Sequence, residues 1–120
     1  MDQQTWLRSL FSAIDAKDAQ AFVAHLTPDA RFQFGNLPAV EGREAIAAMV
    51  GGFFASIAGL EHVLEESWQS GEATICCGSV TYARLDGSLL TVPFANVMRR
   101  RDGAAFDYRI FGDMSALYAP

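Results

Sequence analysis

The sequence predicts an α+β fold in which a curved antiparallel sheet packs against three N-terminal helices. Two observations lead to this prediction. Apolar residues recur at helical spacing in the first half of the chain. Turn dipeptides divide residues 60–113 into four segments of strand character. With 120 residues, 51% of them hydrophobic, the chain is long and apolar enough for residues 1–120 to form one domain with its own core.

The first helix is expected over residues 3–15, where apolar side chains share one face. These side chains are Trp6, Leu7, Leu10, Phe11 and Ile14. Asp2 precedes the helix and can cap its free N–H groups. Asp18 can cap a second, short helix in the same way, and Pro28 should end that helix because the residue before a proline avoids the α conformation.

A short strand is expected at residues 30–35, where side-chain character alternates, followed by a loop over 36–42. A third helix begins near Arg43 and has the clearest helical periodicity in the chain. Its apolar positions are Ile46, Met49, Val50, Phe53, Phe54 and Ile57. Gly51 and Gly52 interrupt this pattern and suggest either a bend or close packing against another backbone.

The turn dipeptides of the second half are Ser70–Gly71, Asp86–Gly87 and Asp102–Gly103, and Asp-Gly is a strong hairpin signal. Strands joined in this way form an antiparallel meander. Pro93 lies inside one of them and requires an edge, a bulge or a bend, because it has no N–H to donate. Long, bent strands make a strongly curved sheet with the helices on its concave face, and the space between is a natural ligand cavity.

Composition argues against several classes of function. The net charge is −5, and only Arg99–Arg101 form a basic cluster, so we expect no nucleic-acid partner. Cys76 and Cys77 are neighbours whose side chains point to opposite faces of a strand, so no intrachain disulfide is expected, and no metal-binding spacing occurs. The sequence has neither a basic signal-peptide region nor an apolar run of about eighteen residues, so we expect a cytoplasmic protein that does not bind a membrane.

Asp113 is the first candidate for chemistry. It closes the strand-like run 107–113, and the stretch 73–83 contains no charged residue. A carboxylate there can lie at the mouth of an apolar cavity, where burial would raise its pKa by up to ~3–5 units and allow proton transfer near neutral pH. The alternative is a solvated strand end. Arg109 is on the same face and can pair with Asp113, keeping it ionised, or with Asp107 in solvent.

Alternation places His62, Leu64, Glu66 and Trp68 on one strand face, which we expect to be the more buried face. His62 can polarise a carbonyl or orient Asp113; alternatively, it is a core or rim histidine bonded to backbone. Trp68 can stack on a planar ligand or serve as a core residue. Glu66 is expected to be exposed near the strand end.

Three further side chains have both a functional and a structural interpretation. The Asn36 amide can hold a water or a substrate oxygen, or it can form a turn before Pro38. Tyr82 can donate a hydrogen bond from its hydroxyl, or it can pack across strands. His25, near a helix C-terminus, is expected to have a structural role.

The order of these elements and several motifs resemble the SnoaL-like branch of the nuclear transport factor 2-like, ketosteroid isomerase-like superfamily. The matching motifs are Ile14-Asp15-Ala16-Lys17-Asp18, Leu26-Thr27-Pro28-Asp29-Ala30, Gly42-Arg43-Glu44-Ala45-Ile46, Tyr82-Ala83-Arg84-Leu85-Asp86-Gly87 and Tyr108-Arg109-Ile110-Phe111-Gly112-Asp113. The resemblance covers nearly the whole chain. It implies a cone-shaped α+β domain and a homodimer formed through the sheet, and it leaves function open because this fold supports many chemistries.

Three activities known in the superfamily give different expectations. Steroid isomerases need polar groups where Leu10, Phe34 and Ala95 align, so that chemistry is not expected. Limonene epoxide hydrolase-like enzymes use five groups, of which Asn36 and Asp113 match two. SnoaL-like polyketide cyclases are cofactor-free aldol catalysts with one acid/base aspartate on the terminal strand, where Asp113 aligns.

The sequence and the resemblance together predict a protein that binds a hydrophobic small molecule, as a cofactor-free lyase or isomerase of the polyketide cyclase type acting on a carbonyl compound. We expect catalytic roles for Asp113, Asn36 and His62. The residues expected to bind the substrate are Tyr82, Trp68, Phe34, Leu10, Phe54 and Phe111. The alternatives are a non-catalytic module that holds an apolar ligand or a protein partner, and an epoxide hydrolase-like enzyme.

Overall fold

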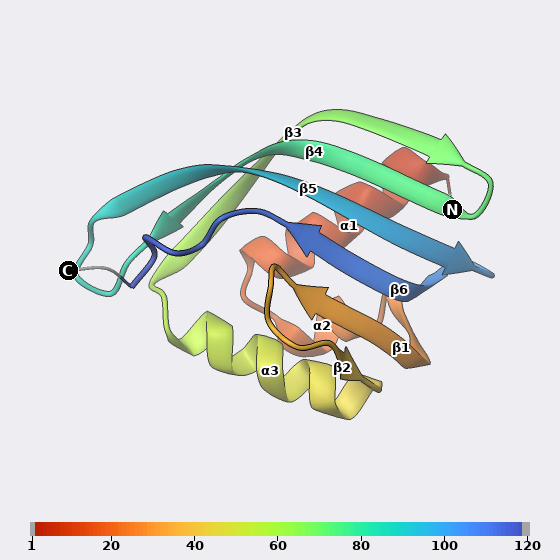
Figure 1. Ribbon diagram of the computed structural model, residues 1–120, viewed down its shortest axis with the longest axis horizontal. Coiled ribbons are helices and arrows are strands. Elements are labelled where there is room, and N and C mark those ends of the chain that lie inside the picture. The colour runs from red at the N-terminus through yellow and green to blue at the C-terminus, as the bar shows by residue number, and fades with distance from the viewer. Residues whose placement is uncertain (1, 119–120) are drawn as a thin grey trace.

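Three helices cover the concave face of a curved, six-stranded sheet in a computed structural model that describes residues 2–118 (Figure 1). The helices are α1 (Gln3–Asp15), α2 (Ala19–Val23) and α3 (Arg43–Ala55). The strands are β1 (Leu26–Phe34), β2 (Val40–Glu41), β3 (Gly59–Ser70), β4 (Ala73–Ala83), β5 (Leu89–Arg101) and β6 (Ala104–Phe111). The predicted α+β architecture is therefore confirmed. Within residues 2–118 no helix is long and apolar enough to cross a membrane.

The two predicted helix caps are both present. The Asp2 carboxylate accepts a hydrogen bond of 2.8 Å from the Thr5 N–H at the start of α1. Asp18 accepts one of 3.0 Å from the Ala21 N–H at the start of α2. Each cap satisfies an N–H that has no partner within its helix, which is why both helices begin where the sequence places them.

The second helix ends earlier than predicted, because the chain enters the sheet before Pro28. Helix α2 stops at Val23 and β1 starts at Leu26, so Pro28 lies inside a strand. Leu26 is fully buried and pairs with Ala105 of β6. The register between β1 and β6 shifts between Leu26 and Arg31, which accommodates a proline that cannot donate to the ladder.

The strand order is β2-β1-β6-β5-β4-β3, with β3 to β6 forming the expected antiparallel meander and β1 running parallel to β6. Pro93 lies in β5 opposite Ser79 of β4, but the pairing of β5 with β6 begins only at Ala95. Pro93 is thus just outside the stretch where β5 has partners on both sides. The predicted need for a local edge is met in this way.

The face predicted for Trp68 is wrong, because β3 contains a β-bulge between Leu64 and Glu66. Leu64 is opposite Gly78 of β4, whereas Glu66 is opposite Cys77, so one extra residue in β3 reverses the alternation beyond it. His62 and Leu64 point to the concave side, while Glu66 and Trp68 point to the convex side. Trp68 is 48% exposed there and is not a core residue. The exposure predicted for Glu66 is confirmed.

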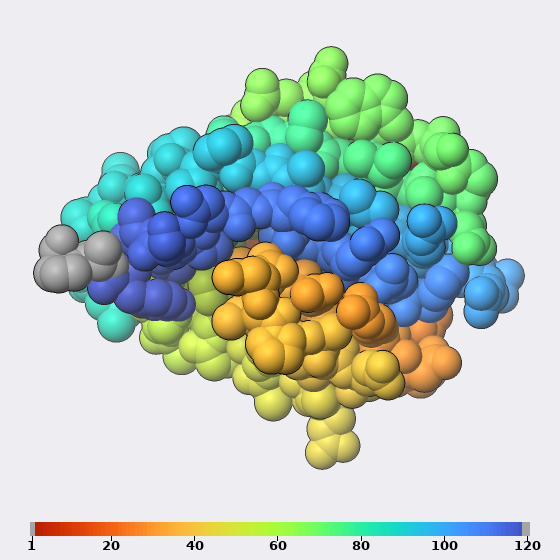
Figure 2. Space-filling view, viewed as in Figure 1, coloured from red at the N-terminus to blue at the C-terminus, as the bar shows by residue number. Residues whose placement is uncertain are grey.

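The core fills the space between the helices and the concave face of the sheet. Its largest fully buried side chains include Tyr108, Phe22, Phe32, Leu7 and Leu10. Leu10, expected to bind a ligand, is completely buried in this core and borders neither of the two cavities described below. In the space-filling view, the chain after β1 and the chain along β6 adjoin on one face of the molecule (Figure 2).

Candidate functional site

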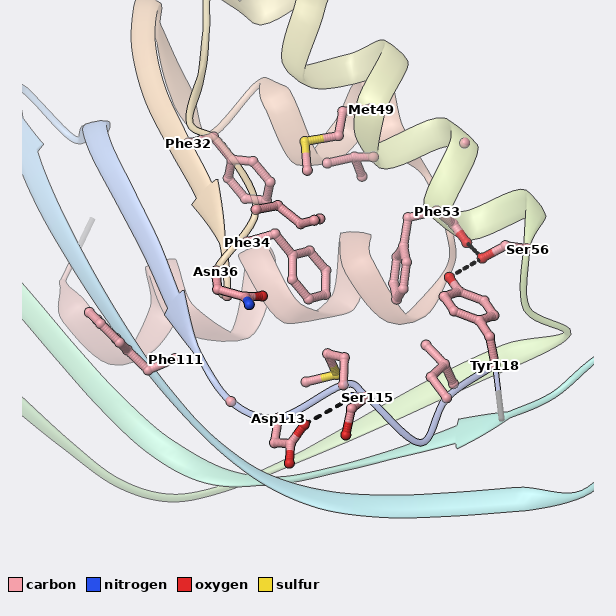
Figure 3. Close-up of a pocket in the computed structure, with 17 residues that line it drawn as sticks. Phe32, Phe34, Asn36, Met49, Phe53, Ser56, Phe111, Asp113, Ser115 and Tyr118 are labelled. Atoms are coloured by element: carbon pink, nitrogen blue, oxygen red, sulfur yellow. Dashed lines mark hydrogen bonds between the residues drawn. The ribbon is translucent and has the colours of Figure 1, made fainter. Parts of the chain in front are cut away.

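An open cavity of about 820 Å³ lies between α3, the loop after β1 and the C-terminal segment 112–118. Its walls are mainly apolar. Figure 3 shows the rings of Phe34 and Phe53 next to one another in the lining, and their centroids are 5.0 Å apart, so the two rings are in contact. We call this space the outer cavity. Its size and apolar walls suit a hydrophobic small molecule.

The C-terminal segment that borders the outer cavity is fixed at two points. The Arg84 guanidinium donates hydrogen bonds of 3.0 Å to the carbonyls of Ala116 and Leu117. The Tyr118 hydroxyl lies 2.6 Å from the Ser56 hydroxyl at the end of α3 (Figure 3). These contacts hold the segment beside α3, so the mouth of the cavity is part of the folded structure.

A smaller cavity of about 50 Å³ lies deeper, against the concave face of the sheet. We call it the inner chamber. It adjoins the outer cavity, since both are bordered by Phe32, Phe34, Val50, Phe53 and Met114. The polar side chains that line it are His62, Tyr82, Asn96 and Tyr108. The inner chamber therefore combines aromatic walls with a few polar groups.

His62 is held in the inner chamber by Asp15, the last residue of α1. The His62 Nδ1 atom is 2.6 Å from Asp15 Oδ1, and the His62 backbone N–H donates to Oδ2 of the same carboxylate at 3.0 Å. Two bonds to one carboxylate fix the position of the strand and the plane of the ring together. Helix α1 crosses β3, which is how residues 47 apart in sequence come into contact.

The surroundings of His62 define what its ring can do. The Phe11 and Phe94 rings pack on it with centroid distances of 4.8 and 5.1 Å, and the His62 side chain is only 10% exposed. A carboxylate accepts hydrogen bonds and does not donate them, so neutral His62 carries its hydrogen on Nδ1. Its Nε2 lone pair is then free to take a proton. This is the arrangement of a general base whose orientation is set by a third group.

Asn96 of β5 and Tyr108 of β6 supply further polar groups. The Asn96 Nδ2 atom donates to the Tyr108 hydroxyl oxygen at 3.2 Å, and the two residues are 2% and 0% exposed. Burial raises the pKa of the Tyr108 hydroxyl, and likewise that of Tyr82. Both tyrosines therefore remain neutral hydroxyls at physiological pH and can donate a hydrogen bond.

Asp113 lies at the rim of the outer cavity, exposed to solvent. Its Oδ1 accepts a hydrogen bond of 2.9 Å from the Ser115 N–H, and Figure 3 shows its side chain pointing away from the rings of Phe34 and Phe53. The backbone and side chain of Ser115 lower the pKa of Asp113. Of the two interpretations, the buried carboxylate with a raised pKa is therefore wrong, and the solvated strand end is confirmed. The catalytic role itself stays a prediction.

Two expectations about nearby charges are decided by distances. Arg109 Nε is 3.6 Å from Asp107 Oδ2, so the interpretation in which Arg109 pairs with Asp107 is confirmed for the partner, although the pair is partly buried and not fully in solvent. His25 Nδ1 is 2.9 Å from the Ala21 carbonyl, and its Nε2 is 2.8 Å from the Ser9 hydroxyl. These bonds agree with the structural role predicted for His25.

The remaining predicted residues divide between the two cavities and the rest of the molecule. Asn36 and Phe111 line the outer cavity, while Tyr82 and Phe54 line the inner chamber. Phe34 borders both. Leu10 and Trp68, placed above in the core and on the convex face, belong to neither cavity.

Sequence reasoning missed Asp15, Asn96 and Tyr108 as site residues. Asp15 and Tyr108 belong to motifs that indicated the fold, and Asn96 lies in a strand whose face assignment depended on the pairing of its neighbours. A polar amide flanked by apolar residues in a predicted central strand was the one available signal for Asn96.

Comparison with known proteins agrees with this architecture. Residues 7–108 match the model of the SnoaL-like domain. No curated protein matches the chain. Among solved structures, an NTF2-like protein of unknown function from Burkholderia pseudomallei is 21% identical, with a TM-score of 0.88 over 98% of this chain and 97% of the other.

Two other similar structures come from proteins with more specific descriptions. One, described as a SnoaL-like polyketide cyclase from a Jannaschia species, is 25% identical, with a TM-score of 0.83 over 98% of this chain and 92% of that one. The other, TerC co-crystallised with polyporic acid, is 17% identical, with a TM-score of 0.82 over 94% and 92% of the respective chains. With a family match over most of its length, this chain belongs to the SnoaL-like domain family of the NTF2-like fold.

Proposed function

We propose that this protein binds a hydrophobic carbonyl compound and transfers a proton on it without a cofactor, as a lyase or isomerase. The observation that carries the proposal is the Asp15–His62 pair at the wall of an apolar chamber. The description of one similar structure as a polyketide cyclase and the complex of another with polyporic acid favour a small-molecule ligand.

In the proposed reaction, His62 Nε2 removes a proton from the carbon beside the carbonyl group. The electron pair of the broken C–H bond forms an enolate, and Asp15 stabilises the imidazolium through the Nδ1–H bond of 2.6 Å. The imidazolium then returns its proton to another carbon, giving an isomer, or to a departing oxygen, giving an elimination. A positioned general base contributes about 10²–10⁴-fold to the rate.

Asp113 and Asn36 have a subordinate place in this proposal, at the mouth of the outer cavity. Asp113 is ionised and exposed, and can exchange protons only with a ligand group that protrudes from the cavity. Asn36 can hold an oxygen of the ligand or a water there. Asn36 and Asp113 are also the two residues that match the epoxide hydrolase-like enzymes, and both border the mouth of this cavity. Epoxides therefore belong among the ligands to be screened.

The experiment begins with a thermal-shift screen of hydrophobic ketones and epoxides. Ketones that bind are then tested for exchange of their α-protons in D₂O, followed by proton NMR. We expect His62→Asn to slow exchange by about 10²–10⁴-fold and Asp113→Asn to leave it nearly unchanged. The opposite pattern would transfer the acid/base role to Asp113. Binding without exchange would support the non-catalytic module.

We also propose that the protein is a cytoplasmic homodimer formed through the convex face of the sheet. This face exposes large apolar side chains, and exposed apolar surface can mark a site of protein association. Val63 is 54% exposed and Trp68 48%. The covering partner proposed here is a second copy of the chain, as the resemblance to the superfamily implies.

A further inference from the structure

The side-chain oxygen of Asn96 is the most unusual polar atom in the inner chamber. Asn96 is 2% exposed, and within residues 2–118 its Oδ1 atom accepts no hydrogen bond. Leaving a buried acceptor unpaired is unfavourable, and folded proteins rarely do so without a reason. Asn96 lines the chamber, so a group inside the chamber can reach it.

Tyr108 lies beside Asn96 and completes a two-sided site. Asn96 pairs with Ile110 across the β5–β6 ladder and Met98 pairs with Tyr108, so Asn96 and Tyr108 are diagonal neighbours on the concave face. The Tyr108 oxygen receives the Asn96 Nδ2 bond, and among the described residues its own hydrogen has no acceptor. The pair thus presents one free acceptor and one free donor.

We infer that Asn96 and Tyr108 bind a hydroxyl group of the ligand, as found in a phenol or an enol. A hydroxyl donates its hydrogen to Asn96 Oδ1 and accepts the Tyr108 hydrogen through its oxygen, so one group satisfies both. An ether or an unsubstituted ring cannot donate to Oδ1. This inference rests on the ligand-binding part of the proposed function and does not require proton transfer by His62.

The site also orients the ligand. Asn96 and Tyr108 lie in the inner chamber, whereas the larger volume is in the outer cavity. The ligand therefore enters with its hydroxyl end first and leaves its apolar body in the outer cavity, against the wall that Phe34 and Phe53 form. In such a pose, the carbon skeleton adjoining the hydroxyl lies in the chamber that His62 borders.

The test uses three probes of similar size: 2-naphthol, 2-methoxynaphthalene and naphthalene. Each is titrated into ¹⁵N-labelled protein, and the side-chain amide signals of Asn96 are followed by NMR. We expect 2-naphthol to bind about tenfold more tightly than either of the other probes, from one good hydrogen bond and the pairing of Oδ1. Only 2-naphthol should shift the Asn96 amide signals strongly.

Variants identify the atoms responsible. In Asn96→Leu with Tyr108→Phe, both polar partners are replaced by apolar groups of similar shape, so folding should be retained and the tenfold preference should disappear. Met98→Leu is the matched control, because Met98 is buried on the same face of β5 and lines neither cavity. It should keep the preference.

Three results would overturn the inference, and each has a distinct meaning. Equal affinity of the wild type for all three probes means that the chamber contains no hydroxyl site, although ligand binding itself stands. A preference that survives the double variant and disappears in His62→Leu assigns the hydroxyl to His62. Failure of every probe to bind removes both the hydroxyl site and the hydrophobic ligand of the proposed function.

Discussion

Replacing Asp15 with asparagine tests how His62 is prepared for chemistry. In the wild type, one carboxylate oxygen accepts from the His62 backbone N–H at 3.0 Å and the other from Nδ1–H at 2.6 Å. An asparagine has a single oxygen, which can keep the backbone bond. Its amide nitrogen then faces Nδ1 and donates to it. The imidazole hydrogen must move to Nε2, and the ring presents a donor to the chamber in place of a base.

The two consequences of Asp15→Asn differ in size. The charge-assisted bond is partly exposed to water, with Asp15 27% exposed, so its loss should lower the free energy of unfolding by only about 1–2 kcal/mol. Proton abstraction should fall much further, by about 10²–10⁴-fold, because the basic lone pair no longer faces the ligand. A small loss of stability with a large loss of exchange is the predicted combination.

The tautomer of His62 can be observed by long-range ¹H–¹⁵N NMR, with His25 as the other histidine in the chain. His25 Nδ1 remains bonded to the Ala21 carbonyl and serves as an internal reference. Asp18→Asn is the control variant, since it removes the same charge while asparagine caps a helix equally well. An Asp15→Asn protein that keeps the wild-type His62 tautomer and exchange rate would refute this reasoning.

Three further predictions concern stability and assembly. Gly78→Ala places a Cβ against a backbone carbonyl of β3 and should destabilise the protein by about 1–3 kcal/mol in urea unfolding, whereas Gly52→Ala, with open space around it, should stabilise it slightly. Burial raises the pKa of the Cys76 thiol from 9.0 to about 12. Its contribution to stability is therefore complete below pH 9.0 and disappears as the pH rises toward 12. Over this pH range, the free energy of unfolding should fall more steeply with pH in the wild type than in Cys76→Ala. Trp68→Arg should yield monomers in sedimentation velocity, while Leu85→Arg, in the β4–β5 turn, should not; a monomeric wild type would contradict the proposed dimer.

Local signals in the sequence predicted most of the fold. Caps such as Asp2 and Asp18 act within three residues, and the Asp-Gly dipeptides define turns by themselves, so the helices and the meander were accessible from the sequence. The end of α2 was not, because the pairing of Leu26 with Ala105 depends on a strand 79 residues later. The start of β1 is therefore a tertiary effect.

The site could be predicted less completely from the sequence, because its geometry depends on contacts between residues that are far apart in the chain. The face of Trp68 depends on a bulge that Gly78 of the neighbouring strand permits by having no side chain. The exposure of Asp113 depends on the turn that follows it, where Ser115 binds its carboxylate. His62 was a candidate from its position in the strand, but its partner Asp15 becomes visible only once α1 is packed across β3.

Chemical rescue of a His62→Ala variant tests the central claim most directly. Removing the imidazole should abolish α-proton exchange of a ketone that still binds, and it leaves a space beside Phe11 and Phe94. Added imidazole should enter that space and restore exchange in proportion to its concentration, while it has no effect on the wild type. Exchange that persists at the wild-type rate in His62→Ala, with or without imidazole, would contradict the assignment of His62 as the base.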